Sequence, residues 1–224
     1  SPANEHVTMQ IAKQLFGINI AECAFMNFAN GTPAYITRRF DYDDNGEKLN
    51  QEDFVSVLNA AHKYKSKTYQ DVGEWLSPLN RVDFLRILIF NFLTGNGDAH
   101  LKNISLLETA DGDMMLSPSY DLMNTKIHLT DNLLALNLFE EFEQTSLPLG
   151  EKYSYKSEDF IEFGTRLKIK ETIITKIIDS FNEKESELLA MVDKSFLSED
   201  AKKLYKNNAV ENYKLFRQST PVVS

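Results

Sequence analysis

Two acids and one amide in the middle of the chain have the residue types that phosphoryl transfer requires. Asp98 and Asn103 lie in the glycine-bounded stretch 95–103, separated by four residues, and Asp121 follows further along. Such a transfer needs a carboxylate to orient the attacking hydroxyl and hard oxygen ligands for Mg²⁺. Asp98 suits the first role, while Asn103 and Asp121 suit the second.

The same stretch also carries groups that can hold positive charge. His100 and Lys102 can offset charge near phosphoryl oxygens. The spacing of Asp98 and Asn103 equals the D-x-x-x-x-N of the kinase catalytic loop, but so short a pattern is informative only through its surroundings. The alternative is a purely structural loop in which the side chains of Asp98 and Asn103 form hydrogen bonds with the backbone. His100 would then be an ordinary buried histidine.

A nearly all-apolar helix is predicted just before this stretch. It follows a break at Pro78, is capped by Asn80, runs to about Leu93 and ends at Gly95. A helix with so little polar face is a buried one, so the stretch 95–103 would have a rigid support. The apolar positions are Val82, Phe84, Leu85, Ile87, Leu88, Ile89, Phe90, Phe92 and Leu93.

A β-hairpin is predicted just after the stretch. Residues 104–108 and 114–116 have strand patterns, and the turn at 111–113 is built from Asp and Gly. A chain that leaves Asn103 and returns through this turn reaches about residue 120. We therefore expect Asp121 to lie beside Asn103.

The first forty residues predict a helix followed by two strands. Residues 2–16 have helical periodicity, with Ser1 as cap and Gly17 as stop. Residues 21–29 and 32–40 alternate as strands and are joined by an Asn-Gly pair, the strongest short hairpin signal.

An acidic segment follows, and two interpretations of it are open. Residues 41–52 match the calcium-loop template D-x-[DN]-x-[DN]-G-x5-E. Such loops lie between two helices, whereas the preceding segment here is strand-like. We therefore favour a solvated turn, followed by a helix over 51–62. The basic run 62–67 then forms a solvated loop or, alternatively, faces an anionic substrate.

The C-terminal part is predicted to be helical over 157–167, 170–192 and 198–216. Ser157 and Ser198 are the candidate caps. The side chains expected to face a core are Leu188, Val192, Leu204 and Tyr213.

Composition narrows the class of protein. The 224 residues carry 33 acids against 24 bases, a net charge of −9 that argues against broad nucleic-acid binding. No apolar run is long enough for a membrane span, and no leader sequence is visible. The single cysteine, Cys23, excludes an internal disulfide and reads as a small core residue. We expect a cytoplasmic protein without direct nucleic-acid or membrane contacts.

The order of elements agrees with a kinase. Residues 1–42 would be the remainder of a small lobe, with helix, hairpin and hinge, and residues 43–224 a helical large lobe with the catalytic loop. Glu5 would pair with a phosphate-binding lysine, and Phe40 and Asp41 would lie near adenine and ribose. None of the nine glycines forms a phosphate-cradling loop before a lysine-bearing strand, so we expect a separate segment or subunit to supply that part.

Several short motifs together resemble the HipA family of bacterial toxin kinases. The resemblance covers residues 1–125 well and the helical tail loosely. The motifs are Asn4-Glu5, Arg39-Phe40-Asp41, Gln51-Glu52-Asp53, the stretch 95–103, and Tyr120-Asp121.

The resemblance implies an α+β, mostly α, protein-kinase-like fold that uses ATP and Mg²⁺. It implies partnership with a HipB-like DNA-binding antitoxin and a protein as substrate. The implied catalytic residues are Asp98, His100 and Lys102, and the implied metal ligands are Asn103 and Asp121. The implied nucleotide-binding residues are Glu5, Arg38, Phe40, Asp41, His100, Lys102, Asn103 and Asp121.

The preferred function is therefore a serine/threonine protein kinase that transfers the γ-phosphoryl group of ATP to a protein hydroxyl. One alternative is a lipid kinase, because the stretch from Asp98 to Asn103 also resembles the D-R-H-x-x-N loop of phosphoinositide kinases, with Ala99 in place of Arg. The other alternative is a non-catalytic module that binds an antitoxin or a second chain.

Overall fold

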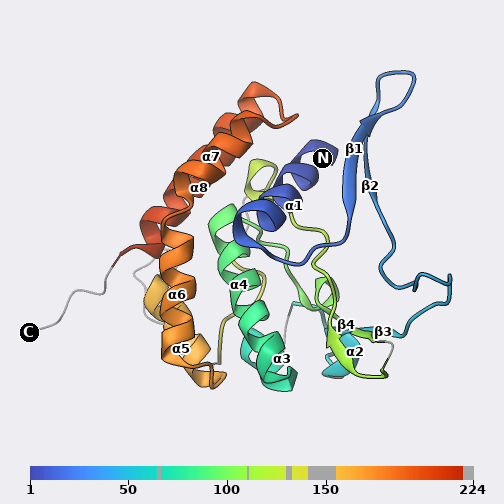
Figure 1. The fold of residues 1–224 in the computed structure, drawn as a ribbon. Helices are drawn as coiled ribbons and strands as arrows, with labels where there is room; N and C mark the ends of the chain where they lie inside the picture. The colour runs from blue at the N-terminus through green and yellow to red at the C-terminus, as the bar shows by residue number, and fades with distance from the viewer. Residues whose placement is uncertain (65–66, 110, 130–132, 141–154, 219–224) are drawn as a thin grey trace, which may run out of the picture.

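The computed structural model is mostly helical with two small antiparallel sheets, and it describes residues 1–64, 67–109, 111–129, 133–140 and 155–218. In Figure 1 the hairpin β1–β2 and the C-terminal helices α5–α8 lie on opposite sides of α1 and α4. Across the described ranges, no helix combines the length and the apolar character needed to span a bilayer.

Helix α4 (Pro78–Thr94) is the central support. Most of its apolar side chains are buried as expected, and Phe84, Leu88 and Phe92 have no exposed surface, but Val82 and Ile87 are only partly buried. Gly95 ends the helix in the left-handed conformation, with φ 73°. The predicted cap is wrong, because Ser77 caps the helix and Pro78 occupies its first turn. The helices that contact α4 are α1 (Pro2–Phe16), α3 (Tyr69–Trp75), α5 (Ser157–Arg166) and α8 (Glu199–Phe216).

The first elements form as predicted, with shorter strands. Helix α1 ends at Gly17, and β1 (Cys23–Asn27) pairs antiparallel with β2 (Pro33–Thr37). Gly31 has φ 83° in the connecting turn. Cys23 is half-buried against the core rather than enclosed in it.

The helix predicted over 51–62 is wrong. Gln51–Asp53 forms strand β3, which pairs with β4 (Ser105–Glu108), and only Phe54–Val57 is helical (α2). Pairing with a distant strand has overridden the local preference for helix. Strand β4 also pairs with β5 (Met114–Leu116), which confirms the hairpin predicted after the stretch 95–103.

The acidic segment is a turn, as favoured. It lies between β2 and β3 rather than between two helices, and Tyr42 pairs with Lys48 across it. Asp43 accepts hydrogen bonds from the backbone N–H groups of Asn45 (2.9 Å) and Glu47 (2.8 Å). Its carboxylate is thus satisfied by its own loop.

The C-terminal helices are four rather than three. The segment predicted as one helix is broken into α6 (Glu171–Asn182) and α7 (Glu185–Asp193), and the break lets α7 pack on α1 and α8. The cap predicted at Ser198 is confirmed, whereas Ser157 is the first helical residue of α5 and not its cap. Leu188, Val192 and Tyr213 are buried as expected, but Leu204 is 48% exposed and that prediction is wrong.

Candidate active site

Loop 95–103 is held by buried side chains behind it. The Asn96 side chain donates to Asn91 Oδ1 (3.0 Å) and accepts the backbone N–H of Asp98 (3.3 Å). The N–H of Gly97 donates to the hydroxyl of Thr125 (3.0 Å), which itself donates to the carbonyl of Gly95 (3.2 Å). The backbone around Asp98 is therefore fixed from two sides.

A wider network of buried amides extends this support to both ends of the chain. Asn4 donates through Nδ2 to the carbonyl of Asn124 (2.9 Å) and accepts that residue's N–H (3.1 Å). Asn212 on α8 donates to the carbonyl of Phe92 (2.8 Å) and accepts from Lys126 Nζ (3.2 Å). Buried polar groups that are satisfied in this way stabilise a single arrangement.

The expected neighbours Asn103 and Asp121 are adjacent. Asn103 lies in the 3₁₀ turn Leu101–Asn103, and its Nδ2 donates to Asp121 Oδ2 (3.3 Å) and to the carbonyl of Asp98 (3.0 Å). The hairpin argument is confirmed on this point. Asp121 has φ 57°, a left-handed backbone that Asp and Asn tolerate better than other non-glycine residues.

Two acids in the region of Asn103, Asp121 and Glu5, have raised pKa values. Burial, and next the charge of Asp98, raise the pKa of Asp121 above its ordinary value. Burial, followed by the charge of Asp121, raises the pKa of Glu5 from 4.5 to about 7. The charge of Asp98 thus disfavours ionisation of Asp121, and that of Asp121 disfavours ionisation of Glu5, so a cation placed beside them would be stabilising.

The basic run contacts loop 95–103 on its other flank. Lys63 Nζ lies 2.8 Å from His100 Nε2, and Tyr64 donates its hydroxyl to Asp98 Oδ1. Because an ammonium group can only donate, His100 accepts at Nε2 and carries its proton on Nδ1, which is buried without a hydrogen-bond partner in the described part of the chain. Burial of the ring lowers the pKa of His100.

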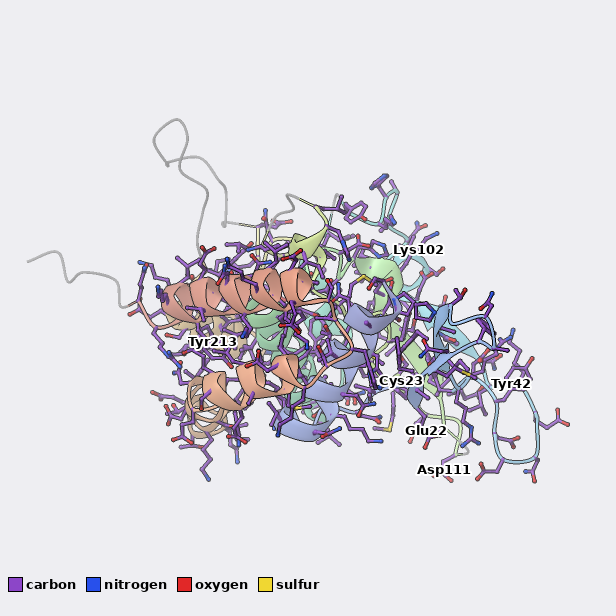
Figure 2. All side chains as sticks on the ribbon, turned by 90° about the horizontal axis from the view of Figure 1, so that it is seen from above. Glu22, Cys23, Tyr42, Lys102, Asp111 and Tyr213 are labelled. Carbon is purple, nitrogen blue, oxygen red and sulfur yellow. The ribbon has the colours of Figure 1, made fainter. Side chains whose placement is uncertain are left out.

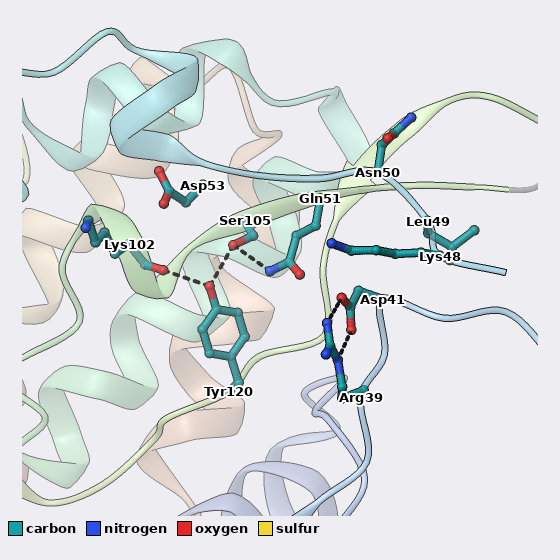
Figure 3. A pocket seen from close by; sticks show the side chains of 10 residues that line it. All are labelled: Arg39, Asp41, Lys48, Leu49, Asn50, Gln51, Asp53, Lys102, Ser105 and Tyr120. Atoms are coloured by element: carbon teal, nitrogen blue, oxygen red, sulfur yellow. Dashed lines mark hydrogen bonds and ion pairs between the residues drawn. The ribbon is translucent and has the colours of Figure 1, made fainter. Parts of the chain in front are cut away.

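A polar cavity of about 480 Å³ opens beside the loop (Figure 3). Lys102 and Asp53 lie at one end of it, and Arg39 and Asp41 lie at the other. Arg39 Nε donates to Asp41 Oδ1 (2.9 Å), and this bond lowers the pKa of the buried Asp41 carboxyl. The volume falls in the range of small-molecule sites. The other lining residues are Lys48, Leu49, Asn50, Gln51, Ser105 and Tyr120.

Tyr120 connects the cavity to the loop. Its hydroxyl donates to the carbonyl of Lys102 (2.8 Å) and shares a hydrogen bond with Ser105 Oγ (2.6 Å). Its ring lies 5.5 Å from that of Phe40. Gln51 Nε2 donates to the same Ser105 oxygen (3.2 Å).

The structure brings most of the predicted site residues to one region. Asp121 lies against Asn103 of loop 95–103, Lys102 of that loop lines the cavity, and Glu5 is electrostatically coupled to Asp121. Asp41 lines the cavity, and Phe40 packs on Tyr120. Arg38 does not line the cavity and instead pairs with Glu22 (3.3 Å) and Asp44 (3.6 Å) on the exposed side of the hairpin.

Sequence reasoning assigned no role to several residues of this region. Gln51, Asp53 and Tyr120 occur in motifs that carry the family resemblance, and this resemblance was the sequence feature that could have assigned them to the site. For Lys63 and Tyr64 the sequence left open a solvated loop or contact with an anionic substrate, and neither interpretation placed them against His100 and Asp98, because that contact depends on tertiary structure.

The residues present fit a magnesium ion. Asn103 and Asp121 offer hard oxygen atoms, and burial together with the charge of Asp98 raises the pKa of Asp121, an effect that a bound cation would offset. No cluster of three or more His, Cys, Asp or Glu side chains suited to a metal occurs in the described ranges. Two protein ligands are what Mg²⁺ uses when substrate phosphates complete its shell.

Comparison with protein families gives one match. A model of the HipA-like C-terminal domain matches residues 1–188. A Haemophilus influenzae protein named "Putative kinase" is 26% identical over 221 residues, which are 87% of this chain and 64% of that protein. The serine/threonine-protein kinase toxin HipA of Shewanella oneidensis is 27% identical over 218 residues, covering 84% of this chain and 48% of that toxin. The chain thus spans less than two thirds of the length of these relatives.

Solved structures show the same fold. HipA in the Shewanella oneidensis HipA, HipB and operator DNA complex superposes with a TM-score of 0.70 at 21% identity, covering 95% of this chain and 55% of that one. The Helicobacter pylori proinflammatory kinase CtkA superposes with a TM-score of 0.58 at 15% identity, covering 95% and 82%. The predicted mostly helical, protein-kinase-like α+β class is therefore confirmed. The lobe boundary at residue 42 stays a prediction.

Proposed function

The chain belongs to the family of HipA-like C-terminal domains, and from that premise we propose that it carries the catalytic loop of an ATP-dependent serine/threonine protein kinase. The observation that supports the proposal most strongly is the joint placement of Asp98, Asn103 and Asp121, whose chain neighbours Lys102 and Tyr120 line a polar cavity. This combination meets the requirements of phosphoryl transfer more closely than those of a capped structural loop.

In the proposed reaction each residue has a separate task. Asp98 orients the hydroxyl of the acceptor protein and takes its proton. Asn103 and Asp121 hold Mg²⁺, and Lys102 lies where it offsets phosphate charge. ATP with its metal supplies the phosphoryl group when bound.

The cavity suits the base and sugar of the nucleotide. Tyr120 and Phe40 offer aromatic surface, and Asp41 is fixed by Arg39 at the far end. We expect tight ATP binding to require a phosphate-cradling loop and lysine from a further segment or subunit. Magnesium-dependent ATP affinity, measured for this chain alone and in its full-length context, checks this point. Equal affinity in both would show that the chain needs no such complement.

The decisive test removes the carboxylate of Asp98. In the full-length protein, Asp98→Asn should lower transfer of labelled γ-phosphate to protein by about 10²–10⁴-fold while leaving the fold intact. The matched control is Asp111→Asn in the exposed β4–β5 turn, which lies far from Lys102 in Figure 2 and should not change the rate. Transfer at the wild-type rate by Asp98→Asn would refute the proposal.

The solved relative in complex with HipB and operator DNA suggests the kind of partner. We propose that the full-length protein is the kinase toxin of a bacterial toxin–antitoxin pair and binds a DNA-binding antitoxin. Copurification of the tagged protein with the product of a neighbouring gene would support this, and a kinase that purifies free of any such product would count against it.

A further inference from the structure

One segment outside loop 95–103 makes direct contact with its catalytic acid. Tyr64 donates its hydroxyl to Asp98 Oδ1, and its ring meets that of His100 edge-on, with centroids 4.9 Å apart at 78°. Lys63 reinforces the contact through Nζ to His100 Nε2 (2.8 Å) and through its carbonyl, which accepts the N–H of Leu101 (3.3 Å). A single short segment therefore covers both the acid and the histidine.

The segment reaches Asp98 from outside the cavity proposed for the nucleotide. Lys102 and Asp53 line that cavity near the loop, whereas Lys63 and Tyr64 are not among its lining residues. A protein acceptor must also approach Asp98 from outside the nucleotide site, because the reacting oxygens lie roughly in line. Tyr64 thus occupies the side from which a substrate hydroxyl would come.

The hydrogen bond of Tyr64 is chemically the one expected of the acceptor. In the proposed reaction, a hydroxyl donates to the Asp98 carboxylate before it attacks, and here a phenolic hydroxyl donates to the same group. Resting on the proposed function, we propose that Tyr64 is a built-in competitor that occupies the acceptor position and must leave before a protein hydroxyl can bind.

A purely supporting role for Tyr64 fits the surroundings less well. The backbone of Asp98 is already held by Asn96 at its N–H (3.3 Å) and by Asn103 at its carbonyl (3.0 Å). The Asp98 side chain is 46% exposed, and the neighbouring His62 is exposed as well. Tyr64 itself is half-buried, so its contact with the acid lies at the edge of the fold rather than in the core.

The test is removal of one oxygen atom. Tyr64→Phe keeps the ring on His100 and deletes the competing hydroxyl. In the full-length protein we expect the KM for myelin basic protein, a generic protein acceptor, to fall by about tenfold, which corresponds to one hydrogen bond to a charged group. ATP hydrolysis without acceptor should rise, because water gains access to Asp98, and the KM for ATP should stay constant.

The matched control is Tyr213→Phe. Tyr213 lies on α8, far from Lys102 in Figure 2, and its buried hydroxyl has no hydrogen-bond partner in the described part of the chain. Deleting this hydroxyl should leave both acceptor KM and ATP hydrolysis as in the wild type. This control separates the effect of the Tyr64 hydroxyl at Asp98 from any general effect of removing a tyrosine hydroxyl.

The two possible roles of Tyr64 predict opposite results. In Tyr64→Phe, a lower kcat both for the protein acceptor and for water would show that Tyr64 orients Asp98. Unchanged kinetics would show that Tyr64 neither competes with the acceptor nor orients the acid. Either result would overturn the proposed competition. The underlying function is tested separately by Asp98→Asn in the same background. Transfer that survives in that double variant would refute the catalytic role proposed for Asp98, and with it the premise of competition, whatever Tyr64 does.

Discussion

The acids of loop 41–47 and the acids around Asn103 are the same residue types in opposite surroundings. In the loop, Asp43 is half-exposed and accepts hydrogen bonds from backbone N–H groups of the same loop, foremost that of Glu47, which lowers its pKa. Around Asn103, burial raises the pKa of both Asp121 and Glu5. The carboxylate of Asp43 therefore already has its hydrogen-bond partners, whereas the carboxylates around Asn103 lack a compensating positive charge.

This difference shows why spacing alone misleads. Residues 41–52 match a complete calcium template, yet Asp41 bonds Arg39 and Asp43 bonds its own loop. Asp98, Asn103 and Asp121 match a far shorter pattern, yet they converge. Carboxylates whose pKa values are raised by burial and by neighbouring charge indicate a functional site more reliably than a matched sequence template does.

Between the two groups of acids compared here, the largest expected effect comes from Asp121→Asn. Asparagine keeps the left-handed backbone but weakens the proposed metal site, so transfer to protein should fall by about 100-fold. The unliganded variant should also unfold at a higher temperature at pH 8, because a strained charge is gone. Kinetics across a magnesium titration and thermal melts measure the two effects.

Asp43→Asn is the control for this prediction. Its carboxylate lies in the satisfied loop, so transfer and its magnesium dependence should remain those of the wild type. If both variants lost activity alike, the distinction between the two groups of acids would fail.

The next effect concerns the buried amides that hold the strained acids in place. Asn4→Ala removes both hydrogen bonds to the backbone of Asn124 and should lower the free energy of unfolding by about 1–3 kcal/mol. Asn45→Ala, in the exposed loop, should change it by less than about 0.5 kcal/mol. Urea titrations of both variants give the comparison, and equal losses would contradict it.

The smallest effect is a pH dependence with opposite signs in the two regions. The folded pKa of Glu5 lies near 7, above the unfolded value, so the unliganded protein loses stability as pH rises from about 4.5 through 7. Glu5→Gln should remove that loss and raise the melting temperature more at pH 8 than at pH 5.

Asp43→Asn should shift stability in the other direction. A lowered folded pKa means that Asp43 stabilises the fold above its unfolded pKa, and that this contribution disappears as pH falls through the folded pKa. The variant should therefore melt slightly lower than wild type at pH 8, and the difference should shrink as the pH falls through the folded pKa of Asp43. If the melting temperature changed in the same direction with pH for Glu5→Gln and Asp43→Asn, the proposed electrostatic difference between the two regions would be wrong.

The sequence revealed the parts of the site that local pattern determines. The apolar run before Gly95 and the turn near Gly112 were enough to place Asp121 beside Asn103. Both features involve segments that are close in sequence, where periodicity and turn residues decide the structure.

The remaining errors come from contacts between distant segments. Gln51–Asp53 became a strand because β4 was available to pair with it. The break between α6 and α7 at Glu183 and Lys184 contains neither Gly nor Pro, and it follows from packing against α1 and α8. The approach of Tyr64 to Asp98 likewise depends on tertiary structure, which single-sequence patterns do not encode.

The amide network also determines when the site can form during synthesis. Asn4 reaches Asn124, and Asn212 reaches the carbonyl of Phe92, each across 120 residues of sequence. A nascent chain that emerges from its N-terminus at about 5–20 residues per second has already exposed loop 95–103 well before α8 leaves the ribosome. Loop 95–103 therefore acquires its full support only after α8 has been made, so the candidate site cannot be completed by a nascent chain that still lacks this helix.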